Sequence, residues 1–359
     1  MKTLALVIPS LNGGGSERVF SILANELSQY YKIKLILLKS GGVYLEDIKS
    51  NVEVIQLNGK SIIKSVPKLI KCLNSLHPDA IMSTLGSVNL IMAIIKPFIN
   101  KSKLIARESS ILSINNKSEK FPGIFDFLFK LFYRKFDKII CQSNYMQKDM
   151  VDNFNVEINN TIVINNPVFI PPLSKNENKY CSEIINFISV GRLEHVKGFD
   201  ILLDVIKEAI KIRPNISLKI LGDGSKKQEL RTKISDMGLV NHVELVGFVS
   251  NPKEYMDEAN ALLISSRYEG FPNVVLEAGA NGLPVIGFNS PGGISEIIDN
   301  RVLGVLVDDF DVKSLAIEIA NFSADKYSSY DIYSLTKNRY SKNKIMNKYH
   351  STVEKVIEG

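Results

Sequence analysis

The chain has 359 residues, of which 45% are hydrophobic and 23% are charged, and its formal net charge is +6. This composition is typical of globular proteins and excludes an intrinsically disordered chain, while the length predicts two domains of ordinary size. No stretch approaches the 18 or so apolar residues that a membrane-spanning helix needs. The three cysteines are scattered without metal-ligand spacing, and no signal-cleavage pattern appears, so we expect a reduced, cytoplasmic setting.

Positive charge is concentrated in the first half of the chain. Residues 1–170 hold 21 Lys and Arg against 13 Asp and Glu, whereas residues 171–359 hold 23 against 25. Such asymmetry indicates that one domain meets an anionic partner, and a merely soluble basic surface is the alternative. We favour a membrane surface and expect no nucleic-acid partner, because nucleic-acid binding would leave the acidic second half and its motifs unexplained.

Short apolar runs alternate with amphipathic stretches through both halves, a pattern typical of parallel sheets covered by helices. The clearest predicted helices are 16–29 and 144–153. The predicted strands of the first half are 3–9, 33–38, 52–56, 79–83, 103–106, 137–141 and 161–164. Those of the second half are 184–190, 217–221, 243–246, 261–264, 284–287 and 305–307.

A polar stretch with several prolines and no periodicity separates the two halves and predicts a linker. We therefore expect a first domain at residues 1–166, a linker at 167–182 and a second domain at 183–330. Residues 331–359 are polar and compatible with a helix that packs back on the first domain.

Three glycines, Gly13 to Gly15, follow the first predicted strand and precede a helix. Glycines there allow a backbone to approach a ligand closely, and Ser16 is placed to cap the helix whose N–H groups would face a phosphate. The pattern is not G-x-G-x-x-G, and no acidic residue closes the second strand, which disfavours a nicotinamide cofactor. A tight turn without a ligand is the alternative.

Two cations, Arg192 and Lys197, follow the first strand of the second half, with Gly191 before them. Ligands of open parallel sheets bind at the carboxyl ends of strands, and a charge-assisted hydrogen bond to a diphosphate contributes about 1.5–3 kcal/mol. Either cation alone would be an ordinary solvated loop charge, and His195 between them is typical of a surface loop.

Two carboxylates, Glu269 and Glu277, frame the expected start of a helix further along the chain. Proline suits the first turn of a helix, so we predict that Pro272 opens this one, with Glu269 in the preceding loop and Glu277 inside. The N–H groups between the two acids lie at the positive end of the helix dipole and can bind an anion. A nucleoside diphosphate sugar, an anion flanked by two sets of hydroxyls, fits this arrangement.

Together these motifs resemble those of glycosyltransferase family four, in the family's order and over nearly the whole chain. They comprise Gly191-Arg192-Leu193 with Lys197-Gly198, the segment from Glu269 to Glu277, Pro291-Gly292-Gly293 with Glu296, and the glycine loop. The resemblance implies the GT-B fold, two doubly wound Rossmann-like α/β domains that face each other across a cleft. It also implies retaining transfer of a sugar from a nucleotide-sugar donor, without a metal or other cofactor.

The resemblance assigns roles residue by residue. Arg192 and Lys197 would neutralise the leaving diphosphate, and Glu269 would hold hydroxyls of the donor sugar. Backbone or side-chain groups of eight further residues would bind the donor: Gly14, Gly15, Gly191, Phe248, Phe271, Asn273, Val274 and Glu277, the last on the ribose diol.

One position departs from the family's pattern. Many members carry a histidine at the end of a first-domain strand, near the donor sugar, where this chain has Arg107 and Glu108. We take Glu108 as the catalytic-site residue at that place, where it would orient the acceptor. An ion pair between Glu108 and Arg107 is the alternative.

The acidic run Asp308, Asp309 and Asp311 offers a handle for a metal ion. It precedes a predicted helix at 312–320, so Asp311 is more simply the N-cap of that helix. We predict no metal site.

Residues 121–138 are rich in aromatic side chains and carry Lys130, Arg134, Lys135 and Lys138. Lysines also recur at helix-like intervals between residues 60 and 71. A basic amphipathic helix can lie in the headgroup region of an anionic membrane, and a core helix with a solvated face is the alternative.

These observations predict a hexosyltransferase-type enzyme that moves a sugar, from a UDP-sugar in our interpretation, to a hydroxyl of a lipid-linked or surface-glycan acceptor. We expect it in bacterial polysaccharide, lipopolysaccharide or O-antigen-type biosynthesis, as a cytoplasmic protein peripheral to the inner face of the plasma membrane. Two alternatives stay open. One is a nucleotide-sugar epimerase on the same fold, with Glu108 as its acid/base candidate, and the other is a non-catalytic nucleotide-sugar-binding protein.

Overall fold

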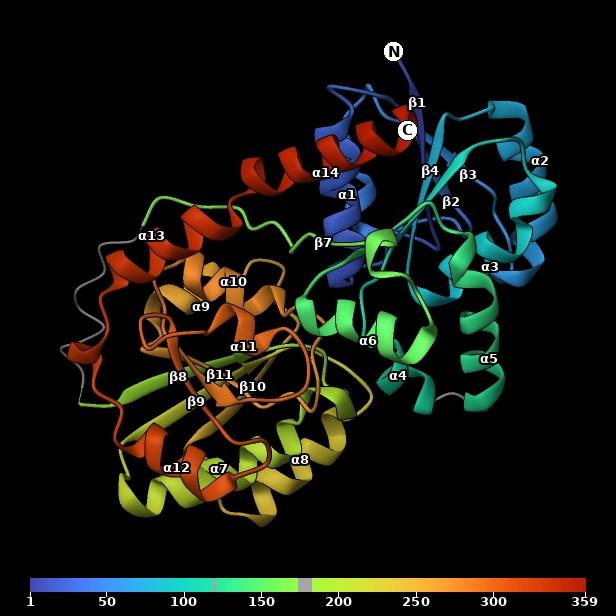
Figure 1. Cartoon of the computed structure of the whole chain (residues 1–359). Coiled ribbons are helices and arrows are strands. Elements are labelled where there is room, and N and C mark those ends of the chain that lie inside the picture. The colour runs from blue at the N-terminus through green and yellow to red at the C-terminus, as the bar shows by residue number, and fades with distance from the viewer. Residues whose placement is uncertain (119–120, 174–182) are drawn as a thin grey trace. The chain divides into compact units, whose positions relative to one another are not determined.

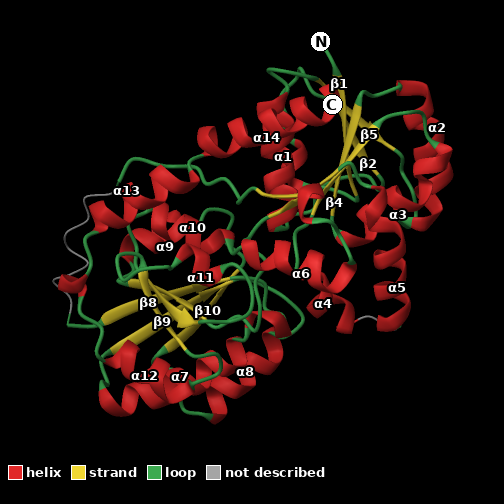
Figure 2. Ribbon diagram, in the orientation of Figure 1, coloured by secondary structure: helices red, strands yellow, loops and turns green. Residues whose placement is uncertain are grey.

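The computed structural model describes residues 1–118, 121–173 and 183–359 (Figure 1). The chain forms two compact units: unit 1 is Met1–Pro167 with Asn343–Gly359, and unit 2 is Val168–Lys342. Each unit has a parallel sheet with helices on its faces (Figure 2). The predicted α/β class, with two Rossmann-like parts, is therefore confirmed.

Unit 1 is built on a seven-stranded parallel sheet in the order β3-β2-β1-β4-β5-β6-β7. Its strands are β1 (Thr3–Ile8), β2 (Lys32–Leu37), β3 (Glu53–Gln56), β4 (Ala80–Thr84), β5 (Lys103–Arg107), β6 (Lys138–Cys141) and β7 (Thr161–Val163). The strand order reverses between β1 and β4. In an open sheet, such a reversal opens a crevice at the carboxyl ends of the strands.

The helices of unit 1 include α14, which returns from the far end of the sequence. They are α1 (Gly15–Leu27), α2 (Val66–Leu76), α3 (Gly86–Ile95), α4 (Leu112–Asn115), α5 (Pro122–Phe132), α6 (Asn144–Phe154) and α14 (Lys342–Glu358). Figure 1 shows α14 beside α1, and both contribute buried residues to one core with β1. From α14 these residues are Ile345, Met346, Tyr349, Val353 and Val356.

Unit 2 is built on a six-stranded parallel sheet in the order β10-β9-β8-β11-β12-β13. Its strands are β8 (Ile185–Val190), β9 (Ile216–Leu221), β10 (Val243–Gly247), β11 (Ala261–Ile264), β12 (Val285–Phe288) and β13 (Gly304–Val307). Its helices are α7 (Phe199–Ile212), α8 (Lys227–Asp236), α9 (Lys253–Glu258), α10 (Asn273–Ala280), α11 (Ile294–Ile297), α12 (Val312–Ala320) and α13 (Ser329–Tyr340). One core packs α7 and α12 on the sheet, and another packs α10 and α13 (Figure 2).

Every predicted strand is found, with each end within one residue of the prediction. Strands that are buried on both faces consist of nearly continuous apolar residues, and this makes them easy to locate in a sequence. None of the helices in the described ranges is both long and apolar enough to cross a bilayer. Cys72 and Cys141 are free thiols, and Cys181 lies outside the described residues.

The chain passes from unit 1 to unit 2 after Pro167 and returns to unit 1 after Lys342, and both points differ from the predicted domain boundaries. Val168 already belongs to unit 2, where its N–H donates to the carbonyl of Tyr340 at 2.9 Å. Residues 169–173 of the predicted linker also belong to unit 2, and its residues 174–182 lie outside the described residues. Residues 331–359 do not act as one piece: α13 buries Ile332 and Tyr340 in unit 2, and only α14 packs on unit 1.

We expect Ile345→Ala to lower the free energy of unfolding by about 2–5 kcal/mol, because it empties a fully buried position where α14 meets α1. Lys348→Ala, on the exposed face of the same helix, is the matched control. Urea unfolding followed by circular dichroism measures both variants. Equal stabilities would mean that α14 is not part of the unit 1 core.

Candidate functional site

The candidate site lies where β8 and β11, neighbours in the unit 2 sheet, end at their carboxyl edges. β8 ends at Val190 and leads through Gly191 and Arg192 into a single 3-10 turn, His195–Lys197. β11 ends at Ile264 and leads through Ser265 to Gly270 into α10. Parallel strands deliver these loops to the same edge, so residues distant in sequence meet there.

The centre of the site is an ion pair between Lys197 and Glu269. The Lys197 Nζ donates to Glu269 Oε1 at 2.5 Å, and the Ser266 hydroxyl donates to the same oxygen at 2.7 Å. The lysine side chain is 21% exposed and the glutamate 12%. A charged pair that is partly shielded from water, yet open on one side, can bind an anion and hydroxyl groups at once.

Glycines on either side fix the position of Lys197. Gly198 has φ +63°, and a Cβ there would lie 2.0 Å from the Ser265 carbonyl oxygen, so only glycine fits. Gly191 lies against the lysine stem, since a Cβ there would be 3.4 to 3.5 Å from its side-chain carbons. The Ser265 hydroxyl donates to the Lys197 carbonyl at 3.1 Å. Lys197 and Gly198, in the loop after β8, therefore both contact Ser265, which directly follows β11.

Arg267, in the loop after β11, connects that loop to the loop after β8 and to α7. Its guanidinium donates twice to Asp200, at 2.9 and 2.7 Å, and once to the His195 carbonyl at 2.6 Å. The side-chain hydrogen bond from Arg267 is the main cause that lowers the pKa of Asp200. The sequence does not reveal this pairing of Arg267 with Asp200, because the two residues are 67 positions apart and neither belongs to a motif.

The loop after β12 is fastened beside Glu269. The Glu269 N–H donates to the Pro291 carbonyl at 3.0 Å, and the Gly293 N–H donates back to the Glu269 carbonyl at 3.1 Å. Gly292 has φ +126°, a conformation suited to glycine. The predicted Pro291-Gly292-Gly293 motif therefore positions the acidic loop.

Helix α10 begins at Asn273, one residue after the predicted start. Pro272 is its N-cap, with φ −72° and an extended ψ of 110°. Proline fixes φ at a helical value, but ψ stays free, so it stands just outside the helix. Glu277 is half-buried within α10, and Phe271 is buried against Tyr340, so a role of Phe271 toward a ligand falls to its backbone.

The structure gathers some of the predicted unit 2 residues and leaves others at the surface. Lys197, Glu269 and Val274 line one small cavity, with Ser189 and Ser266. Arg192 is exposed, and so is Phe248, which follows β10 and is 74% accessible. Asn273 is half-buried at the first turn of α10.

Gly14 and Gly15 lie in unit 1, at the start of α1. The predicted cap is wrong: the helix begins at Gly15, with Gly14 as N-cap and no side-chain capping bond, so Ser16 is inside the helix. Gly14 has an extended backbone (φ −87°, ψ 163°), so helical geometry begins at the next residue, Gly15. The Glu17 carboxylate packs against Gly14, where a Cβ would be 2.1 Å from Glu17 Oε2.

Glu108 lies inside unit 1, directly after β5, and is fully buried. Its Oε1 accepts from Asn89 at 2.6 Å and from the Tyr133 hydroxyl at 2.5 Å, whereas Oε2 is buried and has no hydrogen-bond partner among the described residues. Burial raises the pKa of this carboxyl from 4.5 to about 7. The group therefore titrates near neutral pH.

Arg107 points away from Glu108, as neighbouring strand residues do. Its guanidinium is fully buried and donates to the Tyr349 hydroxyl at 2.9 Å and to Asn166 at 2.7 Å. No ion pair joins Arg107 and Glu108 among the described residues, so the alternative of such a pair is not found.

In the acidic run of Asp308, Asp309 and Asp311, the predicted role of Asp311 can be compared with the structure. The Asp311 side chain accepts from the Ser314 N–H at 3.0 Å and caps α12, so the N-cap prediction is confirmed. Within the described ranges, no group of three or more His, Cys, Asp or Glu side chains is arranged to hold a metal ion.

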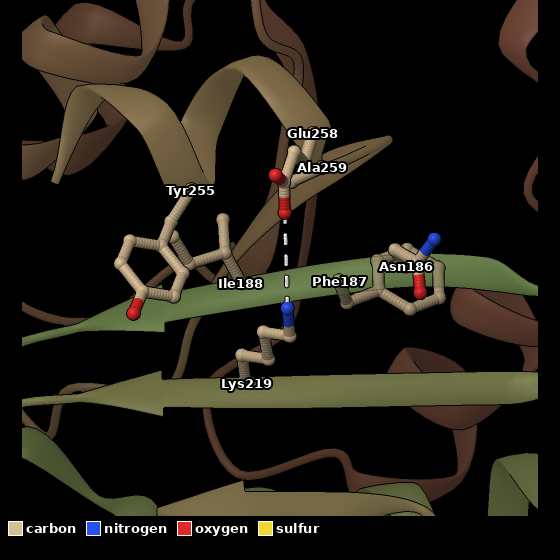
Figure 3. Close-up of a pocket in the computed structure, with 7 residues that line it drawn as sticks. All are labelled: Asn186, Phe187, Ile188, Lys219, Tyr255, Glu258 and Ala259. Atoms are coloured by element: carbon tan, nitrogen blue, oxygen red, sulfur yellow. Dashed lines mark ion pairs between the residues drawn. The ribbon is translucent and has the colours of Figure 1, made fainter. Parts of the chain in front are cut away.

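A separate pocket of about 80 Å³ lies between the sheet and α9 (Figure 3). Lys219 reaches across it toward Glu258 at 3.8 Å and lies over the Tyr255 ring. Asn186, near the start of β8, lines this pocket, whereas Gly191 follows the end of that strand. The pocket therefore lies toward the other end of β8 from Lys197.

Comparison with known proteins shows what this chain is similar to. Residues 174–343 match the family model described as "Glycosyl transferases group 1". The chain is 28% identical over 319 residues, 86% of each chain, to N-acetylgalactosamine-N,N'-diacetylbacillosaminyl-diphospho-undecaprenol 4-alpha-N-acetylgalactosaminyltransferase of Campylobacter jejuni. It is also 28% identical, over 316 residues and 86% of each chain, to the amylovoran biosynthesis glycosyltransferase AmsD of Erwinia amylovora.

A solved structure agrees with the fold. Anabaena Alr3699/HepE in complex with UDP and glucose superposes with a TM-score of 0.82 over 99% of this chain and 100% of that chain, at 18% identity. Two parallel-sheet units of this kind define the GT-B class. Within that class, the comparisons support a glycosyltransferase similar to those of family four, as the motifs predicted.

We expect the buried Glu108 to make stability depend on pH. An acid whose pKa is higher in the folded state stabilises the fold below its unfolded value of 4.5, and this contribution is lost as pH rises through about 7. Glu108→Gln removes the titration. Wild-type stability should therefore fall relative to this variant by roughly 3 kcal/mol across that window.

Urea unfolding of wild type, Glu108→Gln and the exposed-site control Glu157→Gln, at a series of pH values, measures this difference. Identical pH profiles for wild type and Glu108→Gln would contradict a buried carboxyl that resists ionisation.

Proposed function

We propose that the protein transfers a sugar from a nucleotide-sugar donor, a UDP-sugar, to a hydroxyl of a lipid-linked or surface-glycan acceptor with retention of anomeric configuration. The observation that carries the proposal is the Lys197–Glu269 pair at the carboxyl ends of β8 and β11. It offers a cation for a diphosphate and a carboxylate for sugar hydroxyls, 2.5 Å apart. The junction between phosphate and sugar in a donor needs this combination.

In the proposed reaction, the bond between the anomeric carbon and the diphosphate oxygen breaks, and the nucleoside diphosphate leaves with the electron pair. The acceptor hydroxyl forms the new bond on the same face, and its proton passes to the departing phosphate oxygen. Lys197 stabilises the charge that develops on the diphosphate, and the exposed Arg192 adds a second cation. These two cations provide the charge compensation, so we propose that transfer needs no metal.

Lys197 and Glu269 need not separate for this chemistry. An ammonium group has three donors, so Lys197 can keep Glu269 while it binds a phosphate oxygen. Glu269 then accepts from a hydroxyl of the donor sugar through its remaining lone pairs. Glu277, inside α10, is our candidate for the ribose diol, and the first turn of α10 faces the diphosphate with its N–H groups.

The relatives support the choice of donor and acceptor. HepE was solved with UDP and glucose, and the Campylobacter relative is named for a diphospho-undecaprenol acceptor. We infer a UDP-sugar donor, an acceptor carried on a lipid diphosphate, and a cytoplasmic location peripheral to the inner face of an anionic membrane. The basic balance of residues 1–170 supports the membrane contact.

The alternative functions are not favoured. A nucleotide-sugar epimerase would need an acid or base open to the sugar from unit 1, and Glu108, its candidate, is fully buried. A non-catalytic binding protein would not need the pair of Lys197 and Glu269 to be held as closely as Gly198 and Ser266 hold it.

We expect Lys197→Ala and Glu269→Ala each to reduce sugar transfer by at least tenfold, since single groups that stabilise a developing charge contribute about 10²–10³ in rate. The effects should not add in the double variant, because the side chains are in contact. Lys211→Ala, at an exposed ion pair on α7, is the matched control and should retain wild-type turnover. Near-native turnover of either site variant, with its fold intact, would defeat the assigned roles.

A mass-spectrometric screen of nucleotide-sugar donors against lipid-diphosphate-linked and free glycan acceptors tests the function itself. A product that is heavier by one sugar and keeps the donor's anomeric configuration would support the proposal. Formation of an isomerised donor without transfer would favour an epimerase instead.

A further inference from the structure

Helix α5 presents an apolar ridge to solvent. Ile124, Phe127 and Leu131 are 57%, 64% and 42% exposed, and Phe121 just before the helix is 56% exposed. Spacings of three and four residues place Ile124, Phe127 and Leu131 in one stripe along the helix. Surface helices normally place polar residues in such a stripe, so an exposed apolar stripe indicates an interaction surface.

The opposite side of α5 already fixes the helix to unit 1. Phe129 is buried, with edge contacts to the rings of Tyr133 and Phe154. The core-helix interpretation therefore does not account for the whole helix, because three of its seven Ile, Leu and Phe side chains are exposed. These three exposed side chains remain available to a partner.

Basic side chains lie on one flank of the ridge. Lys130 is exposed, and at 100° per residue it projects beside Phe127 on α5. Arg134 is also exposed and follows the helix in the 3-10 turn Tyr133–Lys135. Two other predicted cations are not available there: Lys138 lies on β6 and donates to the Asn159 carbonyl at 2.7 Å, and Lys135 lies over the Phe132 ring. The acidic residue of α5, Asp126, is half-buried and accepts from Asn116 at 2.8 Å.

We propose that this ridge, defined as Ile124, Phe127 and Leu131 with the flanking Lys130 and Arg134, is the surface by which the protein docks on an anionic lipid bilayer. The apolar side chains enter the boundary between headgroups and acyl chains, and the two cations pair with anionic headgroups. The inference rests on the proposed function in one respect, because a lipid-linked acceptor requires the enzyme to work at a membrane.

Charge argues against a second copy of the chain as the occupant. In a two-fold contact the same patch faces itself, so the two copies would bring Lys130 and Arg134 of both chains to one interface. The described part of α5 offers no exposed acid to pair with them. An anionic lipid surface satisfies the ridge and its flank together.

Flotation of the full-length protein with phosphatidylglycerol vesicles, and separately with phosphatidylcholine vesicles, tests the proposal. Two double variants address the patch: Phe127→Ser with Leu131→Ser removes the ridge, and Lys130→Glu with Arg134→Glu reverses its flank. Ile212→Ser with Val240→Ser removes side chains of unit 2 that are 57% and 63% exposed and is the matched control. Circular dichroism melting checks that each variant is folded.

We expect wild type and the control to float with the anionic vesicles, and at least fivefold less with the neutral ones. Both patch variants should lose at least fivefold of the anionic recovery. A ridge variant that floats like wild type, equal wild-type recovery on both vesicles, or the same loss in the control would overturn the proposal. So would a wild-type dimer that does not float and that the ridge variant converts to a monomer.

A transfer assay with a short-chain, water-soluble acceptor and no vesicles separates this inference from the proposed function. The ridge variant should retain wild-type turnover there. If wild type floats but transfers no sugar, the proposed function fails and the docking surface stands.

Discussion

The candidate site depends on one interaction, the ion pair of Lys197 and Glu269 at the edge of the unit 2 sheet. Shielding a charged side chain from water costs free energy unless an opposite charge and hydrogen-bond partners lie near it. The fold meets this condition by closing two loops against each other. Gly198 allows the closure, since any side chain there would strike Ser265, and Arg267 fixes the loops through Asp200. The site is therefore built before a donor arrives, and little ordering remains to oppose binding.

The two units differ in where they place their charged and polar side chains. Unit 2 keeps charge near the surface and braces it with hydrogen bonds. Unit 1 instead buries polar groups: Glu108 with Tyr133 and Asn89, and Arg107 with Tyr349 and Asn166. Arg107 is tied to residues close to both points where the chain leaves and re-enters unit 1, because Asn166 precedes the first crossing and Tyr349 follows the second. Unit 1 also keeps an apolar ridge outside, on α5.

The sequence predicts the sheets well and the details of the site only in part. The strands are recognisable because burial on both faces removes polar residues from them, and the chemistry of Lys197 and Glu269 is recognisable because glycines and prolines mark the loops that carry them. Their contact is not recognisable, since it depends on β8 and β11 being neighbours in the sheet. The same holds for the pairing of Arg267 with Asp200.

The predicted start of α1 is wrong because Ser16 is a good cap by residue type, whereas the helix already begins after Gly14. The burial of Glu108 among Asn89 of α3 and Tyr133 of the turn after α5 depends on tertiary packing, which no local pattern records.

Isothermal titration calorimetry of the purified protein with UDP and with GDP tests the central claim most directly. The account predicts saturable binding of a nucleoside diphosphate by wild type, and a loss of at least tenfold in affinity when Lys197 is replaced by alanine. Absence of heat with either compound, or an affinity that the replacement leaves unchanged, would contradict a phosphate-binding role for this cation.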